Sequence, residues 1–212
     1  MSARYGLPEQ VIFCKTCTLS NQRPNSCVEY LHTIDSKKQT VHFDEHGICD
    51  ACRVAERKKL IDWVEREREL RDMLDRYRSN GDRYDVLIPG SGGKDSFFQA
   101  HVLKHKYGMH PLLITWSPAI YTDVGWRNLQ RWQGIADHQL YTPNRTVHRL
   151  LTRISLETLF HIFAPFIYGQ KALAPKIAKQ YGVKLIAYGE QESDYGDPAE
   201  DNSKALREAI YY

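Results

Sequence analysis

Residues 89–96 read Pro-Gly-Ser-Gly-Gly-Lys-Asp-Ser, a stretch in which glycines alternate with hydroxyl groups, a lysine and an aspartate. Glycines let backbone N–H groups converge on an anion, and the helix expected to follow adds partial positive charge at its N-terminus. Ser91, Lys94 and Ser96 supply further donors and a cation. The stretch therefore predicts a polyphosphate-binding loop. It differs from a Walker A loop, because Asp95 stands where that motif places Ser or Thr. The alternative is an ordinary glycine turn in which Asp95 is a helix N-terminal acid.

Four of the five cysteines form two closely spaced pairs, Cys14-Lys15-Thr16-Cys17 and Cys49-Asp50-Ala51-Cys52. Each pair can hold one metal ion from a tight turn, and four thiolates suit tetrahedral zinc. Such a site has no open coordination position, so the expected zinc is structural rather than catalytic. The alternative is a set of buried or redox-active cysteines. The remaining cysteine, Cys27, is expected to pack rather than to bind metal.

The phosphate loop and the cysteines must be positioned by different kinds of structure. From Tyr84 onward, short apolar runs alternate with helical stretches, which is typical of β-α-β units around a parallel sheet. Ligands of such sheets gather at the carboxyl ends of the strands, where the loop would lie. The expected strands are 85–89, 111–116, 138–141 and 183–188, and the expected helices are Asp95 to about Tyr107, Gly169–Tyr181 and Asp201–Tyr212.

Three segments are expected along the chain. Residues 1–53 form a zinc-binding segment with little core of its own, which therefore needs a metal. Residues 54–81 form a connection, in which apolar residues at helical spacing predict one amphipathic helix over 54–79 that ends at Ser79-Asn80-Gly81. Residues 82–212 form the α/β domain.

Composition excludes several classes of protein. The 212 residues are 42% hydrophobic and 26% charged, close to the averages of globular proteins, which argues against disorder and fibrous repeats. The net charge of +3 is too small to indicate a nucleic-acid partner. No uncharged apolar run approaches the roughly 20 residues of a membrane helix, and the first residues lack the apolar stretch of a signal peptide, so a cytoplasmic location is expected.

Ser-Gly-Gly-Lys-Asp-Ser resembles the PP-loop of the N-type ATP pyrophosphatases. The resemblance implies an adenine-nucleotide alpha-hydrolase-like fold and cleavage of ATP to AMP and pyrophosphate, with adenylation of an oxygen on the acceptor. It implies that the β and γ phosphates are held, with Mg²⁺, by residues of this loop, namely Ser91, Gly92, Gly93, Lys94 and Ser96. Asp95 would orient the loop or reach the metal ion.

Further stretches are similar to the N-acetyl sugar amidotransferase family. They are Leu113–Pro118, Tyr121–Gln130, Pro165–Lys171 and Tyr188–Glu190, together with the zinc knuckle that precedes the loop. This resemblance covers about Cys14 to Gly196. It implies ATP-dependent conversion of the acetamido group of an N-acetylated nucleotide sugar into an acetamidino group, as in the biosynthesis of bacterial lipopolysaccharide and related surface polysaccharides.

Other candidate site residues lie beyond the loop. Adenine would sit near Ile114 to Trp116, with Thr115 and Trp116 as the nucleotide-binding residues, and Lys171 could meet the α-phosphate. Glu190, which follows the last expected strand, is a candidate catalytic residue. The sugar would contact side chains that mix aromatic area with short polar groups, namely Tyr121, Asp123, Trp126, Asn128 and Asp194. For each of these the alternative is helix packing or a solvated surface position.

The absence of a cysteine after Cys52 disfavours thiolation chemistry and an internal Cys-His glutaminase. Ammonia would therefore come from a separate glutaminase or from solution. Family members are longer, so C-terminal strands and acceptor-binding residues are expected to be missing. Three alternatives stay open: a truncated form, a short form that completes its site by self-association as a homodimer, and an inactive remnant. Two other functions stay open: a tRNA-modifying PP-loop enzyme whose zinc knuckle holds RNA, and a non-catalytic zinc-containing scaffold or binding protein.

Overall fold

The computed structural model describes residues 7–23, 40–79, 81 and 83–189. These residues form two compact units, one that reaches Arg66 and one that begins at Glu67. Cys27 and the helix expected at 201–212 lie outside the described residues. Within the described residues, no helix is long and apolar enough to cross a membrane.

The first unit is built from two tight turns and a helix. Isolated antiparallel bridges join Phe13 to Ser20 and Phe43 to Cys49, and helix α1 (Asp50–Lys58) begins directly after the second bridge. Among the described residues of this unit, the buried apolar cluster consists of Cys14, Val41 and Cys49, with four half-buried neighbours. Such a core is too small to stabilise the turns by burial, as expected for a segment that depends on metal.

The prediction of one helix over 54–79 is wrong, because α1 ends at Lys58 and a second helix, α2 (Trp63–Asp75), begins after four intervening residues. The side chain of Asp62 accepts hydrogen bonds from the backbone N–H groups of Val64 and Glu65, at 3.0 and 3.1 Å. An aspartate in this position stabilises a helix start, which favours a new helix over continuation of α1. The spacing of the apolar residues predicted the helical segment α2, but it gave no signal for the break between α1 and α2.

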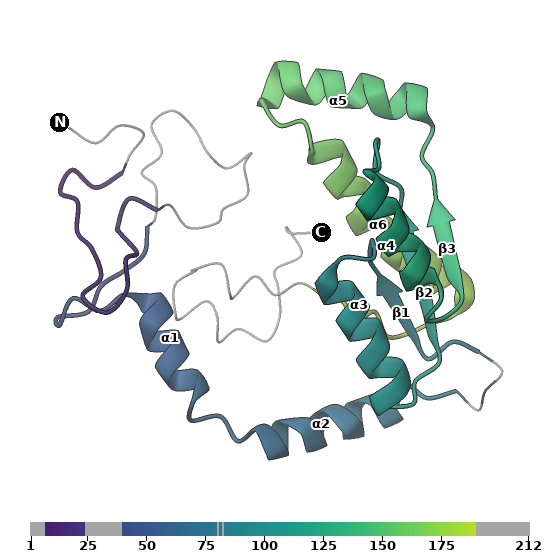
Figure 1. The fold of residues 1–212 in the computed structure, drawn as a ribbon, viewed down its shortest axis with the longest axis horizontal. Helices are drawn as coiled ribbons and strands as arrows, with labels where there is room; N and C mark the ends of the chain where they lie inside the picture. Colours follow the sequence, from purple (N-terminus) through teal and green to yellow (C-terminus); the bar gives the residue numbers. More distant parts are fainter. Residues whose placement is uncertain (1–6, 24–39, 80, 82, 190–212) are drawn as a thin grey trace. The chain divides into compact units, whose positions relative to one another are not determined.

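The second unit contains a parallel sheet of three strands, in the order β1 (Val86–Pro89), β2 (Pro111–Trp116) and β3 (His138–Tyr141) (Figure 1). All three strand predictions are confirmed. Residues 183–188 lie along the other side of β1, where Ile186 forms a single parallel bridge with Leu87. Leu87 donates to Leu185 and accepts from Ala187, both at 2.9 Å, so this predicted strand pairs over a shorter length than expected.

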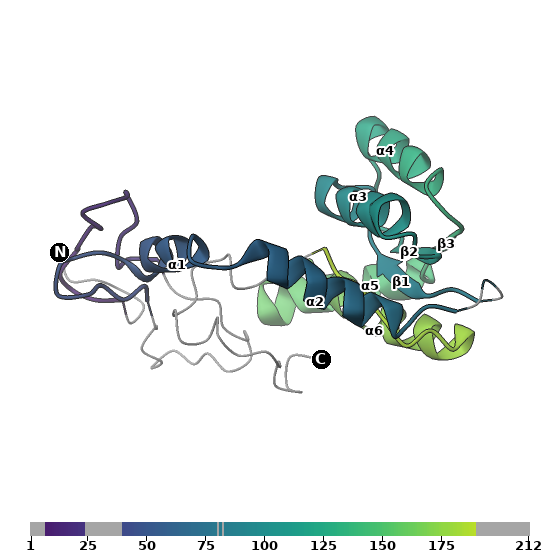
Figure 2. The same ribbon diagram turned by 90° about the horizontal axis from the view of Figure 1, so that it is seen from below.

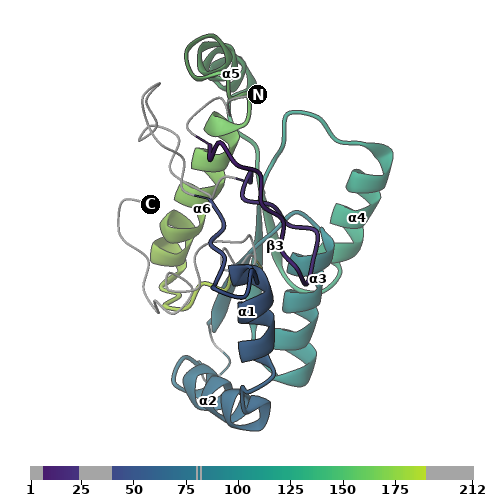
Figure 3. The same ribbon diagram turned by 90° about the vertical axis from the view of Figure 1, so that its left-hand side faces the viewer.

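Helices cover both faces of the sheet (Figures 2 and 3). Helix α3 (Lys94–His101), the π-helical turn η2 (Val102–Lys106) and α4 (Asp123–Gln133) pack on Val86, Ile88 and Leu113. Helix α6 (Ala164–Tyr181) packs on Leu87, Leu112 and Ile114. Because successive strand residues point to opposite faces, this alternation buries both sides and gives the expected α/β fold.

Sequence analysis did not predict α4 as a helix, and it did not predict α5 (Arg145–Leu159) at all. Both begin at a residue whose side chain caps the helix. Thr122 Oγ1 accepts from the backbone N–H of Gly125 at 3.0 Å, and Asn144 Oδ1 accepts from those of Thr146 and Val147 at 3.1 Å. These capping residues were the available signal for both helices.

Candidate functional site

The glycine loop connects the carboxyl end of β1 to the start of α3. Gly90 N donates to the Ile114 carbonyl at 2.9 Å, so the loop leaves the sheet while still paired with β2. A β-carbon at Gly90 would lie 2.5 Å from the Ser96 β-carbon and 2.8 Å from the Trp132 ring. Gly92 has a φ of +80°, a conformation that favours glycine. Local packing therefore requires glycine at position 90, and the backbone conformation favours it at position 92.

Helix α3 begins at Lys94, and its N-cap residue, Gly93, has no side chain with which to cap it. The first N–H groups of a helix need external acceptors, and together with the helix dipole they favour an anion. Lys94 Nζ lies 2.7 Å from Asp95 Oδ1, with the two side chains 87% and 62% exposed. Ser96 Oγ donates to the Gly93 carbonyl at 3.2 Å. The loop therefore presents backbone donors, a hydroxyl group and an exposed cation at one helix N-terminus.

Residues that precede Glu190 also reach this helix start. Gln99 Nε2 donates to the Tyr188 carbonyl at 2.9 Å, and a β-carbon at Gly189 would lie 3.2 Å from the backbone of Asp95 and Ser96. The end of the segment 183–189 is therefore anchored beside the loop. Glu190 and Asp194 themselves lie outside the described residues.

Thr115, a predicted nucleotide-binding residue, is buried at the carboxyl end of β2. Its hydroxyl group donates to the Gly90 carbonyl at 2.6 Å and lies 2.9 Å from Nε2 of His138. His138 Nδ1 lies 3.2 Å from Nε2 of Gln133. Burial lowers the pKa of His138. Neither His138 nor Gln133 was identified as functional from the sequence, because neither belongs to a motif. The parallel pairing of β2 with β3 brings His138 to Thr115, and Gln133 reaches His138 from the end of α4.

Trp116 packs on the α6 face of the sheet. Its ring stacks on Tyr141, with centroids 5.7 Å apart and an interplanar angle of 13°, and it lies against Gly169 of α6. Its indole Nε1 is buried and has no hydrogen-bond partner among the described residues. The structure therefore gives this predicted adenine-binding residue a clear packing role.

The predicted sugar-binding residues lie on and before α4. Tyr121 donates to Ser117 Oγ at 3.2 Å, and its ring meets Trp126 edge to face, with centroids 5.2 Å apart. Trp126 is 41% exposed, Asp123 is exposed in the first helical turn, and the half-buried Asn128 lies on the same helix. Lys171 is exposed on α6. Since α4 and α6 cover opposite faces of the sheet, Lys171 is separated from the α4 residues by the sheet layer.

The four paired cysteines of the first unit converge. All four sulfur atoms lie within 4.8 Å of one another; Cys14 and Cys52 are 3.9 Å apart, and Cys17 and Cys49 are 3.6 Å apart. Zinc–sulfur bonds of about 2.3 Å in a tetrahedron place the sulfur atoms about 3.8 Å apart. The donor set and its geometry therefore fit a zinc ion.

Electrostatics of the cluster also favour a cation. Burial raises the pKa of Cys14, but backbone N–H groups of Cys17, Cys49 and Thr16 outweigh this and lower the pKa to about 6. Burial raises the pKa of Cys49, and burial together with the neighbouring sulfur atoms raises that of Cys52 to about 12. The thiolate of Cys14 is thus stabilised by the backbone, whereas Cys49 and Cys52 resist ionisation beside it unless a metal supplies positive charge.

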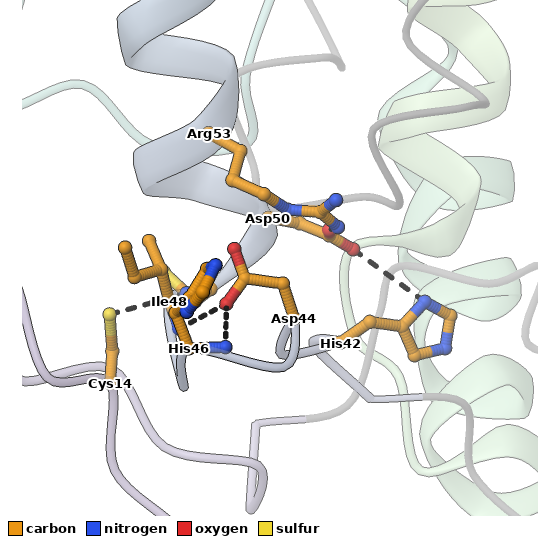
Figure 4. Close-up of polar contacts among 8 residues, drawn as sticks. Cys14, His42, Asp44, His46, Ile48, Asp50 and Arg53 are labelled. Atoms are coloured by element: carbon orange, nitrogen blue, oxygen red, sulfur yellow. Dashed lines mark hydrogen bonds and ion pairs between the residues drawn. The ribbon is translucent and has the colours of Figure 1, made fainter.

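The turn that carries Cys49 is held by side chains around it (Figure 4). Asp44 Oδ1 accepts from the backbone N–H groups of Ile48 and His46, at 2.9 and 3.0 Å, and these hydrogen bonds lower the pKa of Asp44. Asp50 is buried at the start of α1, where it pairs with Arg53 and lies 3.6 Å from His42 Nδ1. These contacts fix the approach of Cys49 and Cys52 to the cluster.

No protein-family model and no curated protein matches the chain. Among solved structures, it is similar to a predicted subunit of tRNA methyltransferase from Methanocaldococcus jannaschii, with 25% identity and a TM-score of 0.39 over 51% of this chain and 54% of the other. It is also similar to NH3-dependent NAD synthetase from Campylobacter jejuni, with 14% identity and a TM-score of 0.47 over 63% of this chain and 59% of the other. The chain spans little more than half the length of each. At TM-scores below 0.5, the activities of these two proteins do not carry over to it.

Proposed function

We propose that the chain is an ATP pyrophosphatase that adenylates the amide oxygen of an N-acetylated nucleotide sugar and forms an amidine with ammonia. The observation that carries the proposal is the glycine loop: it ends at an uncapped helix N-terminus with Lys94 and Ser96 in the first turn. Preorganised donors of this kind stabilise the negative charge that develops on departing pyrophosphate. The motif resemblance and the α/β fold support the same site.

The reaction has two steps. The acetamido oxygen attacks the α-phosphorus of ATP, the bond to the β-phosphate oxygen breaks, and pyrophosphate leaves. Ammonia then attacks the activated carbon, AMP leaves with the former amide oxygen, and loss of a proton gives the acetamidino group. An amide oxygen is a poor leaving group until it is adenylated, so the first step makes the second possible.

The loop residues have distinct parts in this proposal. The N–H groups at the start of α3, with Lys94, hold the β and γ phosphates. Mg²⁺ is commonly bound by one or two carboxylates together with substrate phosphates, and Asp95, an exposed carboxylate in the first turn of α3, fits that role. When bound, the ion neutralises phosphate charge. Zinc in the four-cysteine cluster stabilises the first unit and takes no part in the reaction.

Sugar recognition is proposed for the residues that follow β2. Tyr121 and Trp126 offer aromatic area, and Asp123 and Asn128 offer polar groups on the same helix, α4. Ammonia is proposed to come from a separate glutaminase subunit or from solution, because the chain has no cysteine after Cys52 to serve as a glutaminase nucleophile.

The test is pyrophosphate release from ATP and Mg²⁺ across a panel of nucleotide sugars that carry acetamido groups, with ammonium present. We expect release only with an acetamido sugar, and a product one mass unit lighter, because oxygen is replaced by NH. Release that depends on tRNA instead would support the alternative of an RNA-modifying enzyme. If no pyrophosphate is released with either acceptor and the chain does not bind ATP, the proposed function is contradicted. The remaining alternative is then a zinc-containing scaffold.

A further inference from the structure

Three hydrogen bonds connect the end of α4 to the first glycine of the phosphate loop. Gln133 Nε2 lies 3.2 Å from His138 Nδ1, His138 Nε2 lies 2.9 Å from Thr115 Oγ1, and Thr115 Oγ1 lies 2.6 Å from the Gly90 carbonyl oxygen. The His138 ring is also held edge-on by Trp132, with centroids 5.4 Å apart. The side chains come from α4, β3 and β2, so the connection crosses the sheet.

The direction of each of these hydrogen bonds follows from the last acceptor in the series, the Gly90 carbonyl oxygen. A carbonyl oxygen only accepts, so the single hydroxyl proton of Thr115 is donated to Gly90. Thr115 Oγ1 must then accept from His138, which places the ring proton on Nε2. His138 Nδ1 is left as an acceptor for the Gln133 amide. The burial that lowers the pKa of His138 favours the same neutral ring.

The Gly90 carbonyl matters for the loop because it shares a peptide plane with the Ser91 N–H. The peptide unit is planar and trans, so the carbonyl oxygen and the next N–H point in opposite directions. When Thr115 holds the Gly90 oxygen, the Ser91 N–H is fixed on the side away from Thr115. A loop that must present backbone N–H groups to an anion gains from this constraint, because freely rotating glycines would otherwise have to be ordered on binding.

We propose that Thr115 and His138 are positioning residues that set the orientation of the Gly90–Ser91 peptide, with His138 acting as the Nε2–H tautomer. The proposal rests on the proposed function only in that the anion is the phosphate of ATP. Neither side chain needs to touch nucleotide. Thr115 acts through the Gly90 carbonyl, and His138 acts through Thr115.

The first test needs no variant. In the full chain labelled with ¹⁵N, the ring nitrogens of His138 are expected to show a protonated Nε2 and an unprotonated Nδ1 at pH 7. Protonation of Nδ1 alone would overturn the proposal, because Thr115 would then have no donor partner. A charged ring would overturn the neutral Nε2–H tautomer, because its Nδ1–H would meet the Gln133 amide donor. This measurement is independent of whether ATP binds.

The second test compares pairs of variants by calorimetric ATP binding in the presence of Mg²⁺. Thr115→Val keeps the side-chain shape but removes the hydroxyl group, and His138→Leu removes the donor to Thr115. We expect each to weaken ATP binding about tenfold, the equivalent of one hydrogen bond. Thr115→Ser and His138→Gln, which keep a hydroxyl group and an N–H donor, are expected to restore most of the affinity.

Thr152→Val is the matched control. Its hydroxyl group also donates to a backbone carbonyl, that of His148 at 2.8 Å, but within α5. We expect this variant to bind ATP as the unmodified chain does. Folded Thr115→Val and His138→Leu variants with unchanged ATP affinity would overturn the positioning role. If the unmodified chain binds no ATP, the proposed function fails. In that case the positioning role is tested by the NMR chemical shift of the Ser91 backbone amide. This shift must change in Thr115→Val but not in Thr152→Val.

Discussion

Gly92 of the phosphate loop lies directly against the backbone of Asn128 in α4. A β-carbon at Gly92 would be 2.8 Å from the carbonyl carbon and oxygen of Asn128 and 2.9 Å from the Leu129 nitrogen. These contacts are with backbone atoms of a helix whose Leu129 and Trp132 are fully buried, so the helix cannot easily move away. The loop is therefore seated on α4, which also carries the proposed sugar-binding residues.

Gly92→Ala is expected to displace the loop and abolish measurable ATP binding. The substitution combines the cost of a positive φ for alanine, about 1–2 kcal/mol, with a backbone overlap that only movement of the loop can relieve. Gly182→Ala is the matched control, because Gly182 has a φ of +66° but no atom within 4 Å of an added β-carbon. The control should lose stability in thermal unfolding and keep ATP affinity. Unchanged ATP affinity in Gly92→Ala would show that the loop is not the nucleotide site.

Lys94→Ala is expected to reduce pyrophosphate release by about a hundredfold or more, because a charged donor at the departing pyrophosphate is lost. Lys94 is highly exposed, so the melting temperature should change little. Lys179→Ala, which removes another exposed lysine in the last turn of α6, is the control and should retain full activity. Equal rates for the two variants in steady-state assays would contradict the assignment of Lys94.

Cys49→Ser is expected to lose bound zinc, measured by elemental analysis of the purified chain. Cys49 is fully buried at the centre of the small cluster of the first unit, so loss of metal should also unfold this unit and lower solubility. Cys27→Ser is the control and should keep one zinc ion per chain. A soluble Cys49→Ser protein that retains stoichiometric zinc would rule out Cys49 as a ligand.

Asp85 is expected to make the second unit sensitive to acid. Although its burial raises the pKa, hydrogen bonds from the backbone N–H groups of Ser79 and His110 outweigh this and hold the pKa below its ordinary value. A carboxyl group whose pKa is lowered by folding stabilises the fold above its unfolded pKa, and this contribution disappears as pH falls through the folded pKa. Stability should therefore fall below about pH 4.

Asp85→Asn tests this assignment in urea unfolding. An amide would place its own N–H₂ against one of the two backbone donors, so we expect a loss of about 1–3 kcal/mol at pH 7. The difference from the unmodified chain should shrink between pH 4 and pH 2. Asp137→Asn is the control, because the Asp137 side chain is exposed and accepts from the Tyr84 hydroxyl group. A difference that stays constant with pH would contradict the role of the Asp85 charge.

Gly169→Ala is expected to destabilise the second unit by about 1–3 kcal/mol through overpacking. The added β-carbon would lie 2.3–2.7 Å from three atoms of the Trp116 indole ring, which is itself stacked on Tyr141. Trp116→Phe removes part of this ring, so the double variant should be more stable than the sum of the two single effects predicts. Strict additivity in denaturant unfolding would show that the two positions do not share the strain.

The sequence alone determined the features that depend on local patterns. The strands 111–116 and 138–141 match β2 and β3 at both ends, and the first of them is a short, mainly apolar run. The glycine loop between β1 and α3 could be located because its glycines, lysine and serines are contiguous. The four cysteines could be grouped because two pairs with metal-ligand spacing leave few other arrangements.

Only the tertiary structure decided which distant residues support the loop. His138 lies 48 positions beyond Gly90 and reaches it through Thr115 only because β1, β2 and β3 pair in parallel. The close approach of Gly92 to Asn128 likewise depends on how α4 packs on the sheet. Contacts of this kind are set by the burial of whole elements against one another, and spacing along the chain carries no record of which elements become neighbours.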